Sequence, residues 1–341
     1  ADINALLPYD AMTLGNHGFD KGPGAAEETD RLLREAEQDA ASKGVVGIRD
    51  YEMAENIDTW INRFAAGING LRVDAGVYPE RLRAAIDAGW HTGKELPGSA
   101  GLGHVGAMKL ISDGSLNTRS AYCSTPYSGI EPLTYGTLSY TPQQIEDYMR
   151  LATEHGFDIA CHAIGDEANT IALNAVAATH AHGSIEHAQM LKPVDIPRFA
   201  ELGLTASIQP QHAMDDRDVI TRFWANPAGI PYPFRALHDA GTTLRMGSDA
   251  PVAPLDPWLA ISAAVLGTES SDREPFQPEQ CLDVHTSLAA STATGRDRLA
   301  SGDPADVVLL DADPYAADTP EAMRAMPQHV VMTLLCGERT Y

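Results

Sequence analysis

Seven short strand-like runs alternate with amphipathic helical stretches along most of this chain, at 45–49, 71–77, 107–111, 158–162, 184–187, 204–209 and 243–249. The helical stretches are 27–42, 55–68, 79–88, 142–154, 167–180, 193–202 and 233–240. Strands that alternate with helices of this length pair in parallel through crossover units. A closed (β/α)8 barrel takes eight such units and about 250 residues. The pattern therefore predicts an α/β, TIM-like barrel that lacks its first strand, because no strand-like run precedes the helix at 27–42.

The barrel is expected to span residues 1–300, and a second, smaller unit is expected to follow it. Two further helical stretches, 257–265 and 281–293, close the first part. The runs 305–310 and 330–335 then predict strands of a small β domain over 301–341, as part of a β-sandwich. Residues 112–140, rich in Gly, Ser, Tyr and Pro, form a loop long enough to suggest a functional role.

Composition excludes several classes of function. A formal net charge of -23 argues against a nucleic-acid partner, because a phosphate backbone is bound by a basic face. No apolar run approaches the length of about 18 residues that a membrane span needs. The 4 cysteines show no C-x-x-C spacing, so free thiols in a reducing compartment, and hence a cytoplasmic protein, are expected.

Three of the strand-like runs end in a side chain of a type that binds metals. The runs 158–162, 184–187 and 243–249 end in His162, His187 and Asp249, respectively. Barrel enzymes place their chemistry at the carboxyl ends of parallel strands and on the loops that follow. Each residue also has a simpler interpretation: the histidines as core or surface residues, and Asp249, which precedes Ala-Pro, as the cap of a turn.

The order of several short motifs makes a family resemblance specific. The chain resembles amidohydrolase family 3, the group of N-substituted formamide deformylase-like metal-dependent hydrolases. The motifs are M-K-L-I-S-D-G-S-L, C-H-A-I-G-D-E-A, I-E-H-A-Q, S-I-Q-P-Q-H and G-S-D-A-P-V, followed by G-D-P-A-D-V-V-L-L and G-E-R-T-Y near the end. Each motif alone is weak evidence, whereas the ordered set covers essentially the whole chain.

The resemblance implies hydrolysis of a C–N bond other than a peptide bond, in an amide, formamide or imide, by a metal-activated hydroxide. A divalent metal, expected to be Zn²⁺ with one or two ions per site, lowers the pKa of its water from 15.7 to about 7. The resemblance makes His162 and His187 metal ligands, which neutral imidazoles are suited to be. It makes Asp249 both a ligand and the group that carries the proton of the attacking water to the leaving nitrogen.

Lys109 is the fourth implied metal ligand. An unmodified lysine is a cation and repels a metal, but in two-metal relatives a lysine at this strand end is carboxylated by CO₂ and bridges the ions. Burial favours the neutral amine that this modification needs. The alternative is an ion pair between Lys109 and Asp113.

Other candidates lie on the loops that follow the predicted strands. His212 follows the run 204–209 and is expected to hydrogen-bond the substrate or transition state, with a solvated loop histidine as the alternative. Arg119, Tyr122 and Tyr127 in the long loop are substrate-binding candidates, and the loops 112–140 and 212–232 are expected to set specificity. Asp166 is expected to cap the helix that starts at 167.

One departure from the family leaves a second class of function open. Family members carry a His-x-His pair after the first barrel strand, and near its start this chain has only the single His17. An N-terminal fragment or companion chain is therefore expected to complete the barrel, and a homodimer is a further possibility among the partners. The alternatives are a catalytically silent or ligand-binding barrel subunit, or an ester or lactone hydrolase.

Overall fold

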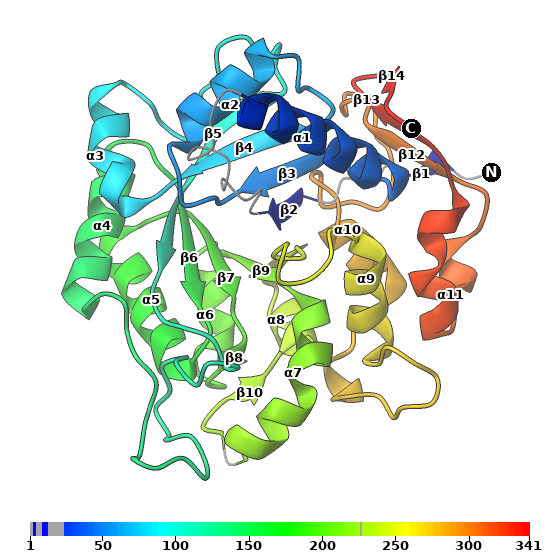
Figure 1. Ribbon diagram of the computed structural model, residues 1–341. Coiled ribbons are helices and arrows are strands. Elements are labelled where there is room, and N and C mark those ends of the chain that lie inside the picture. The colour runs from blue at the N-terminus through cyan, green and yellow to red at the C-terminus, as the bar shows by residue number, and fades with distance from the viewer. Residues whose placement is uncertain (1–2, 5–8, 13–23, 226) are drawn as a thin grey trace.

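The computed structural model describes residues 3–4, 9–12, 24–225 and 227–341. Its centre is a curved, eight-stranded parallel sheet surrounded by helices (Figure 1). In chain order the strands are β2 (Tyr9–Met12), β3 (Gly47–Asp50), β4 (Arg72–Val77), β5 (Gly103–Ile111), β6 (Ile159–Ala163), β7 (Gly183–His187), β9 (Thr205–Ile208) and β11 (Thr243–Met246). The predicted parallel barrel-type sheet is confirmed, and each of the seven predicted runs overlaps one of these strands.

The sheet also contains a strand that the sequence analysis did not predict. Strand β2 pairs in parallel with β3, with Tyr9 opposite Gly47 and Met12 opposite Asp50. A strand therefore does precede the first helix, and the prediction that this chain supplies none is corrected. At the other end of the sheet, β11 lies near β2, although no hydrogen-bonded pairing joins these two strands in the part of the chain described.

Helices surround the sheet, most of them connecting successive strands and three of them following its last strand (Figure 1). They are α1 (Gly24–Ser42), α2 (Asn56–Ala65), α3 (Pro79–Asp87), α4 (Pro142–Glu154), α5 (Asp166–Thr179), α6 (Ile196–Glu201), α7 (Pro210–Phe223), α8 (Phe234–Asp239), α9 (Pro257–Leu266), α10 (Val284–Ala290) and α11 (Pro320–Arg324). Ile48, Val73 and Ile185 on the strands are fully or almost fully buried beneath them. Cys161 on β6 is also fully buried, and because neighbouring residues of a strand point to opposite faces, its side chain points away from that of His162.

Helix α7 was not predicted, because residues 212–232 were expected to form a loop. Pro210 begins this helix at a position where a missing N–H costs nothing, and Pro210, Ala213, Met214, Ile220 and Phe223 are buried along one side. This helix starts two residues after β9 and places His212 in its first turn.

A second sheet contains β1 (Ile3–Asn4), β12 (Val307–Leu310), β13 (Val330–Leu335) and β14 (Glu338–Arg339), all antiparallel. It lies beside α1, and β1 from the start of the chain pairs with β12 (Figure 1). The Thr333 hydroxyl donates to the carbonyl of Ala41 at 2.6 Å, and the Arg72 guanidinium pairs with the buried Asp306 at 2.6 Å. These contacts fasten the small sheet to the barrel.

Short elements complete the chain. Strands β8 (Met190–Leu191) and β10 (Ile230–Pro231) form a two-stranded antiparallel ladder over the loops, and the 3-10 turns are η1 (Pro278–Gln280), η2 (Pro314–Ala316) and η3 (Met326–His329). All four cysteines are free thiols. No helix in the described ranges is both long and apolar enough to cross a membrane.

Candidate metal centre

Two histidines and one aspartate converge at the carboxyl end of the parallel sheet. His187 is the last residue of β7, His212 lies in the first turn of α7 after β9, and Asp249 follows β11. One ligand atom from each lies within 4.8 Å of the other two, and His212 Nε2 is 4.0 Å from Asp249 Oδ2. We refer to His187, His212 and Asp249 as the metal-ligand triad.

The backbone of the triad is strained where its side chains turn inward. His187 has φ 72° and Asp249 has φ 57°, in the left-handed region that side chains other than glycine rarely adopt. Such residues cost of order 1–3 kcal/mol each and gather at functional sites. Two of the three triad members therefore hold conformations that the fold maintains at a cost to stability.

The electrostatics of the triad fit a divalent cation. His187 Nδ1 and His212 Nε2 are buried nitrogens without a hydrogen-bond partner, and a buried polar atom left in this state costs about 1–3 kcal/mol. Burial, followed by the charges of His162 and Lys109, holds the pKa of His187 well below its usual range, so its imidazole is neutral as a ligand must be. Two nitrogens and one carboxylate oxygen form a donor set that suits Zn²⁺.

His162, predicted as a ligand, lies beside the triad and is not part of it. Its ring contacts that of His187 edge-on, with centroids 4.4 Å apart. Its Nε2 lies 3.6 Å from Asp113 Oδ1 and 3.5 Å from the carbonyl of Gly114. Burial and the nearby Lys109 ammonium lower the pKa of His162 to about 3, so this imidazole is neutral too.

His212 takes the third position in the cluster. Its ring stacks on that of His187 with centroids 5.8 Å apart. The sequence analysis gave His212 a role toward the substrate, and the structure places it among the groups that could hold a cation.

Lys109 lies close to the triad on β5. It is 7% exposed, and its ammonium lies 4.8 Å from the centre of the Tyr51 ring. The Lys109 charge helps to lower the pKa values of His162 and His187. It also partly offsets the rise that burial causes in the pKa of Asp249. The position is compatible with the predicted ligand role, and carboxylation of Lys109 remains a prediction.

Asp113, the alternative partner of Lys109, has a carboxylate that accepts hydrogen bonds from the backbone. Its fully buried carboxylate accepts the N–H groups of Tyr122 at 2.9 Å, Ile164 at 3.1 Å and Gly165 at 2.9 Å. Burial raises the pKa of Asp113 to about 7, although these hydrogen bonds oppose the shift. The residue therefore joins the long loop to the end of β6 next to His162.

Neither Asp249 nor Asp166 caps the turn or helix that the sequence suggested. The Ser248 hydroxyl, not the Asp249 carboxylate, accepts the N–H of Ala250 in the turn after β11. Asp166 is the first residue of α5 after the N-cap Gly165, so the predicted capping role is wrong. Its buried carboxylate instead accepts the backbone N–H of Ser124 at 3.0 Å and the Ser124 hydroxyl, which fastens the long loop to α5.

The three substrate-binding candidates in the long loop occupy different environments. Tyr127 is 1% exposed and its hydroxyl donates to the carbonyl of Ala121 at 2.9 Å, so it holds the loop together. Arg119 is exposed with its guanidinium 5.4 Å from the Phe223 ring, and Tyr122 is half-buried. Contact between the substrate and any of the three remains a prediction.

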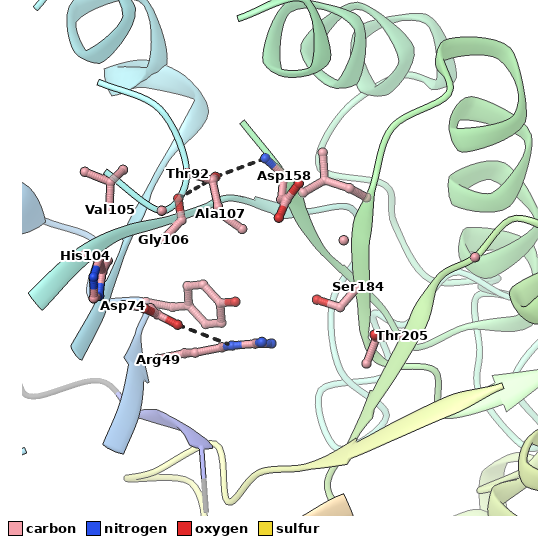
Figure 2. Close-up of a pocket in the computed structure, with 15 residues that line it drawn as sticks. Arg49, Asp74, Thr92, His104, Val105, Gly106, Ala107, Asp158, Ser184 and Thr205 are labelled. Atoms are coloured by element: carbon pink, nitrogen blue, oxygen red, sulfur yellow. Dashed lines mark hydrogen bonds and ion pairs between the residues drawn. The ribbon is translucent and has the colours of Figure 1, made fainter. Parts of the chain in front are cut away.

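Two cavities open at opposite ends of the barrel. One, of about 580 Å³, lies among the amino-terminal halves of the strands and is lined by polar residues that include Arg49, Asp74, Ser184 and Thr205 (Figure 2). In this cavity Arg49 Nε lies 4.0 Å from Asp74 Oδ2. The other, of about 420 Å³, lies at the carboxyl end and includes Tyr78, which the sequence analysis did not single out.

Comparisons with known proteins agree with this geometry. Residues 4–341 match the amidohydrolase family. The chain belongs to the amidohydrolase family. It is 29% identical over 322 residues to the putative amidohydrolase YtcJ of Bacillus subtilis, covering 87% of this chain and 59% of that protein. It is 25% identical over 240 residues to the N-substituted formamide deformylase of Arthrobacter pascens, covering 63% of this chain and 42% of that protein.

A solved structure supports the same assignment. An uncharacterized metal-dependent hydrolase from Pyrococcus furiosus superimposes with a TM-score of 0.71 and 25% identity, over 85% of this chain and 61% of that one. This amidohydrolase-family chain thus spans less than two thirds of the length of these relatives. The resemblance drawn from the sequence motifs is confirmed.

Proposed function

We propose that this amidohydrolase-family chain acts as a metal-dependent hydrolase on a C–N bond other than a peptide bond. The convergence of His187, His212 and Asp249 at the carboxyl end of the barrel carries the proposal. The name of one relative, an N-substituted formamide deformylase, supports an amide-type substrate.

The triad would hold the cation, and Lys109 and His162 lie close enough to contribute to its surroundings. When bound, a divalent metal supplies Lewis acidity, which lowers the pKa of water and polarises a carbonyl. We propose Zn²⁺ because of the nitrogen-rich donor set. Carboxylation of Lys109 and ligands supplied by an N-terminal companion piece belong to the same proposal.

Asp249 is the residue we propose for proton transfer. Its side chain is 33% exposed, so its carboxylate faces both the histidines and the mouth of the barrel. Burial raises the pKa of Asp249, while the charges of His212 and Lys109 oppose the rise. A carboxylate placed in this way can accept the proton of a water nucleophile and return it to the departing nitrogen.

Hydrolysis by the zinc-loaded protein tests the proposal. The substrates are a formamide, an N-substituted amide, a cyclic imide and a Xaa-Pro dipeptide, each followed by release of the amine or acid. We expect turnover of at least one non-peptide amide and a loss of at least a hundredfold in Asp249→Asn, with circular dichroism unchanged. His104→Ala, which alters a half-buried histidine at the opposite end of the barrel, is the control and should retain activity.

Two results would contradict the proposal. The first is cleavage of the dipeptide alone, which would remove the proposed bond specificity. The second is full activity in Asp249→Asn, which would remove the triad from the reaction.

A further inference from the structure

The buried carboxylate of Asp216 lies on α7, one helical turn beyond His212. Asn117 Nδ2 donates to its Oδ1 at 2.6 Å, and Gln189 Nε2 and the Tyr232 hydroxyl donate to its Oδ2 at 2.8 and 2.7 Å. The three donors come from the long loop, from the residues after β7 and from the residue after β10. One side chain therefore joins α7 to three neighbouring segments at the carboxyl end of the sheet.

Gln189 lies two residues after His187, beyond a strained turn. His187 has φ 72° and Ala188 has φ 44°, so two consecutive residues adopt the left-handed conformation. Gln189 is 2% exposed, and the hydrogen bond of its amide to Asp216 fixes the course of the chain after this turn. The Gln189–Asp216 hydrogen bond thus connects the segment that carries His187 to the helix that carries His212.

Tyr232 forms a second bridge between the same two segments. Its backbone N–H donates to the carbonyl of Gln189 at 2.6 Å, while its hydroxyl donates to Asp216. Tyr232 is buried and has φ 47°, a conformation that costs free energy and persists only where the surroundings maintain it. It directly follows β10, which is paired with β8, so this bridge starts from an ordered ladder.

The two bridges act on the histidine rings of the metal-ligand triad through the backbone. His212 and Asp216 are four residues apart in α7, so their side chains lie on the same side of the helix. The rings of His187 and His212 stack with their planes 15° apart and their centroids 5.8 Å apart. Ligands that are already held in place bind a cation more tightly, because little conformational entropy is lost on binding.

We propose that Asp216 is a positioning residue of the metal centre: through Gln189 and Tyr232 it fixes His187 relative to His212 before a cation binds. This inference rests on the proposed function, and it adds a residue that acts through its neighbours without touching the cation or the substrate. Asn117 bonds to the other oxygen of the same carboxylate, but it comes from the long loop, which carries no member of the triad. Loss of the Asn117 bond should therefore have a different effect from loss of a bridge.

Cobalt binding tests this inference without catalysis. Co²⁺ is titrated in place of Zn²⁺, because its visible absorption reports the number and arrangement of its ligands. Gln189→Met keeps the length of the side chain and removes the donor to Asp216. Loss of hydrogen bonds around metal ligands typically weakens metal binding by about 10–100-fold. We expect a rise of about tenfold in the Kd for Co²⁺, at the lower end of this range because the Tyr232 bridge remains, and a weaker absorption band.

Two control variants separate positioning from a general loss of stability. Asn117→Ala removes one hydrogen bond from the same carboxylate, and it should leave the Kd and the absorption band unchanged. Asp306→Ala removes a different buried carboxylate, the partner of Arg72 beside the small sheet, so it should lower the free energy of unfolding and leave the band unchanged. Tyr232→Phe removes the second bridge while keeping the ring, and it should raise the Kd as Gln189→Met does.

Three results would overturn the inference or the proposal on which it rests. A loss of cobalt affinity in Asn117→Ala or Asp306→Ala equal to that in Gln189→Met would show that Asp216 only supports the fold. An unchanged Kd in both Gln189→Met and Tyr232→Phe would show that the bridges do not position the ligands. If the wild-type chain bound no Co²⁺, the proposed function would fail, and metal-free crystals of Gln189→Met would decide the inference: it predicts that the rings of His187 and His212 lose their stacking, and unchanged stacking would contradict it.

Discussion

Replacing Asp113 by alanine removes the acceptor of three backbone N–H groups, the buried ones of Ile164 and Gly165 and the partly buried one of Tyr122. A buried donor left without a partner costs about 1–3 kcal/mol. The three together would cost at least about 3 kcal/mol, but the carboxylate itself is fully buried and its raised pKa shows an unfavourable desolvation that the replacement relieves. We therefore expect Asp113→Ala to lower the free energy of unfolding by about 3–5 kcal/mol.

Urea unfolding followed by circular dichroism measures this change. Asp113→Asn, which keeps one acceptor oxygen, should lose less stability than Asp113→Ala. Asp239→Ala is the control, because Asp239 is 59% exposed and pairs only within one turn of helix with Arg235, so its replacement should cost less than about 0.5 kcal/mol. A loss below about 1 kcal/mol in Asp113→Ala would refute the reasoning that these three N–H groups depend on this carboxylate.

Three further predictions concern the site and its surroundings. His212→Ala should weaken zinc binding, measured by competition with a chelator, at least tenfold, whereas His104→Ala should leave it unchanged. In the metal-free protein, the lowered pKa values of His162 and His187 mean that the unfolded chain binds more protons below about pH 6.5. These two groups should therefore lower the unfolding free energy as the pH drops from 6.5 toward 4, by up to about 1.4 kcal/mol per pH unit each. Because the raised pKa of Asp113 acts in the opposite direction over this range, the slope is compared with that of His162→Gln, which should be smaller; an unchanged slope would contradict the buried neutral state. Asp216 is buried and accepts Gln189 Nε2 at 2.8 Å and the Tyr232 hydroxyl at 2.7 Å, so Asp216→Ala should lower the thermal midpoint more than Tyr232→Phe, which removes only one donor; equal shifts would contradict this.

The sequence predicted the sheet well because its strands carry a strong local signal. Runs such as those that became β4 and β5 contain β-branched and apolar residues between helices with clear boundaries. Strand β2 lacks that signal, because Tyr9-Asp10-Ala11-Met12 is four residues long, contains an acid and has no β-branched residue. Its place in the sheet depends on pairing with β3, which no local pattern reports.

Helix α7 was missed for a related reason. Its apolar pattern is interrupted by Asp215, Asp216, Arg217 and Asp218. Asp216 is nevertheless buried, and its carboxylate accepts hydrogen bonds from Asn117, Gln189 and Tyr232. Tertiary contacts of this kind outweigh local propensity.

The candidate site was predicted in composition but not in arrangement. The motifs identified His162, His187, His212, Asp249 and Lys109, and the structure brings all five to one end of the barrel. Which histidines face a common point depends on side-chain orientation, and His162 Nε2 is directed toward Asp113 and the Gly114 carbonyl. Sequence spacing carries no information about that choice.

The cavity of about 420 Å³ at the carboxyl end of the barrel left little signal in the sequence, because Ile111 alone of its lining lies in a quoted motif. Its lining comes from the ends of three strands and from the residues just before α4, and residues such as Met53 and Tyr78 belong to none of the family motifs. Only the fold brings them together.

The most direct test of the metal-ligand triad is anomalous X-ray scattering at the zinc edge from crystals grown with Zn²⁺. We expect a peak about 2.0–2.2 Å from a nitrogen of His187, a nitrogen of His212 and an oxygen of Asp249. A fully zinc-loaded crystal whose peak lies away from these three side chains, or that shows no peak among them, would contradict the account.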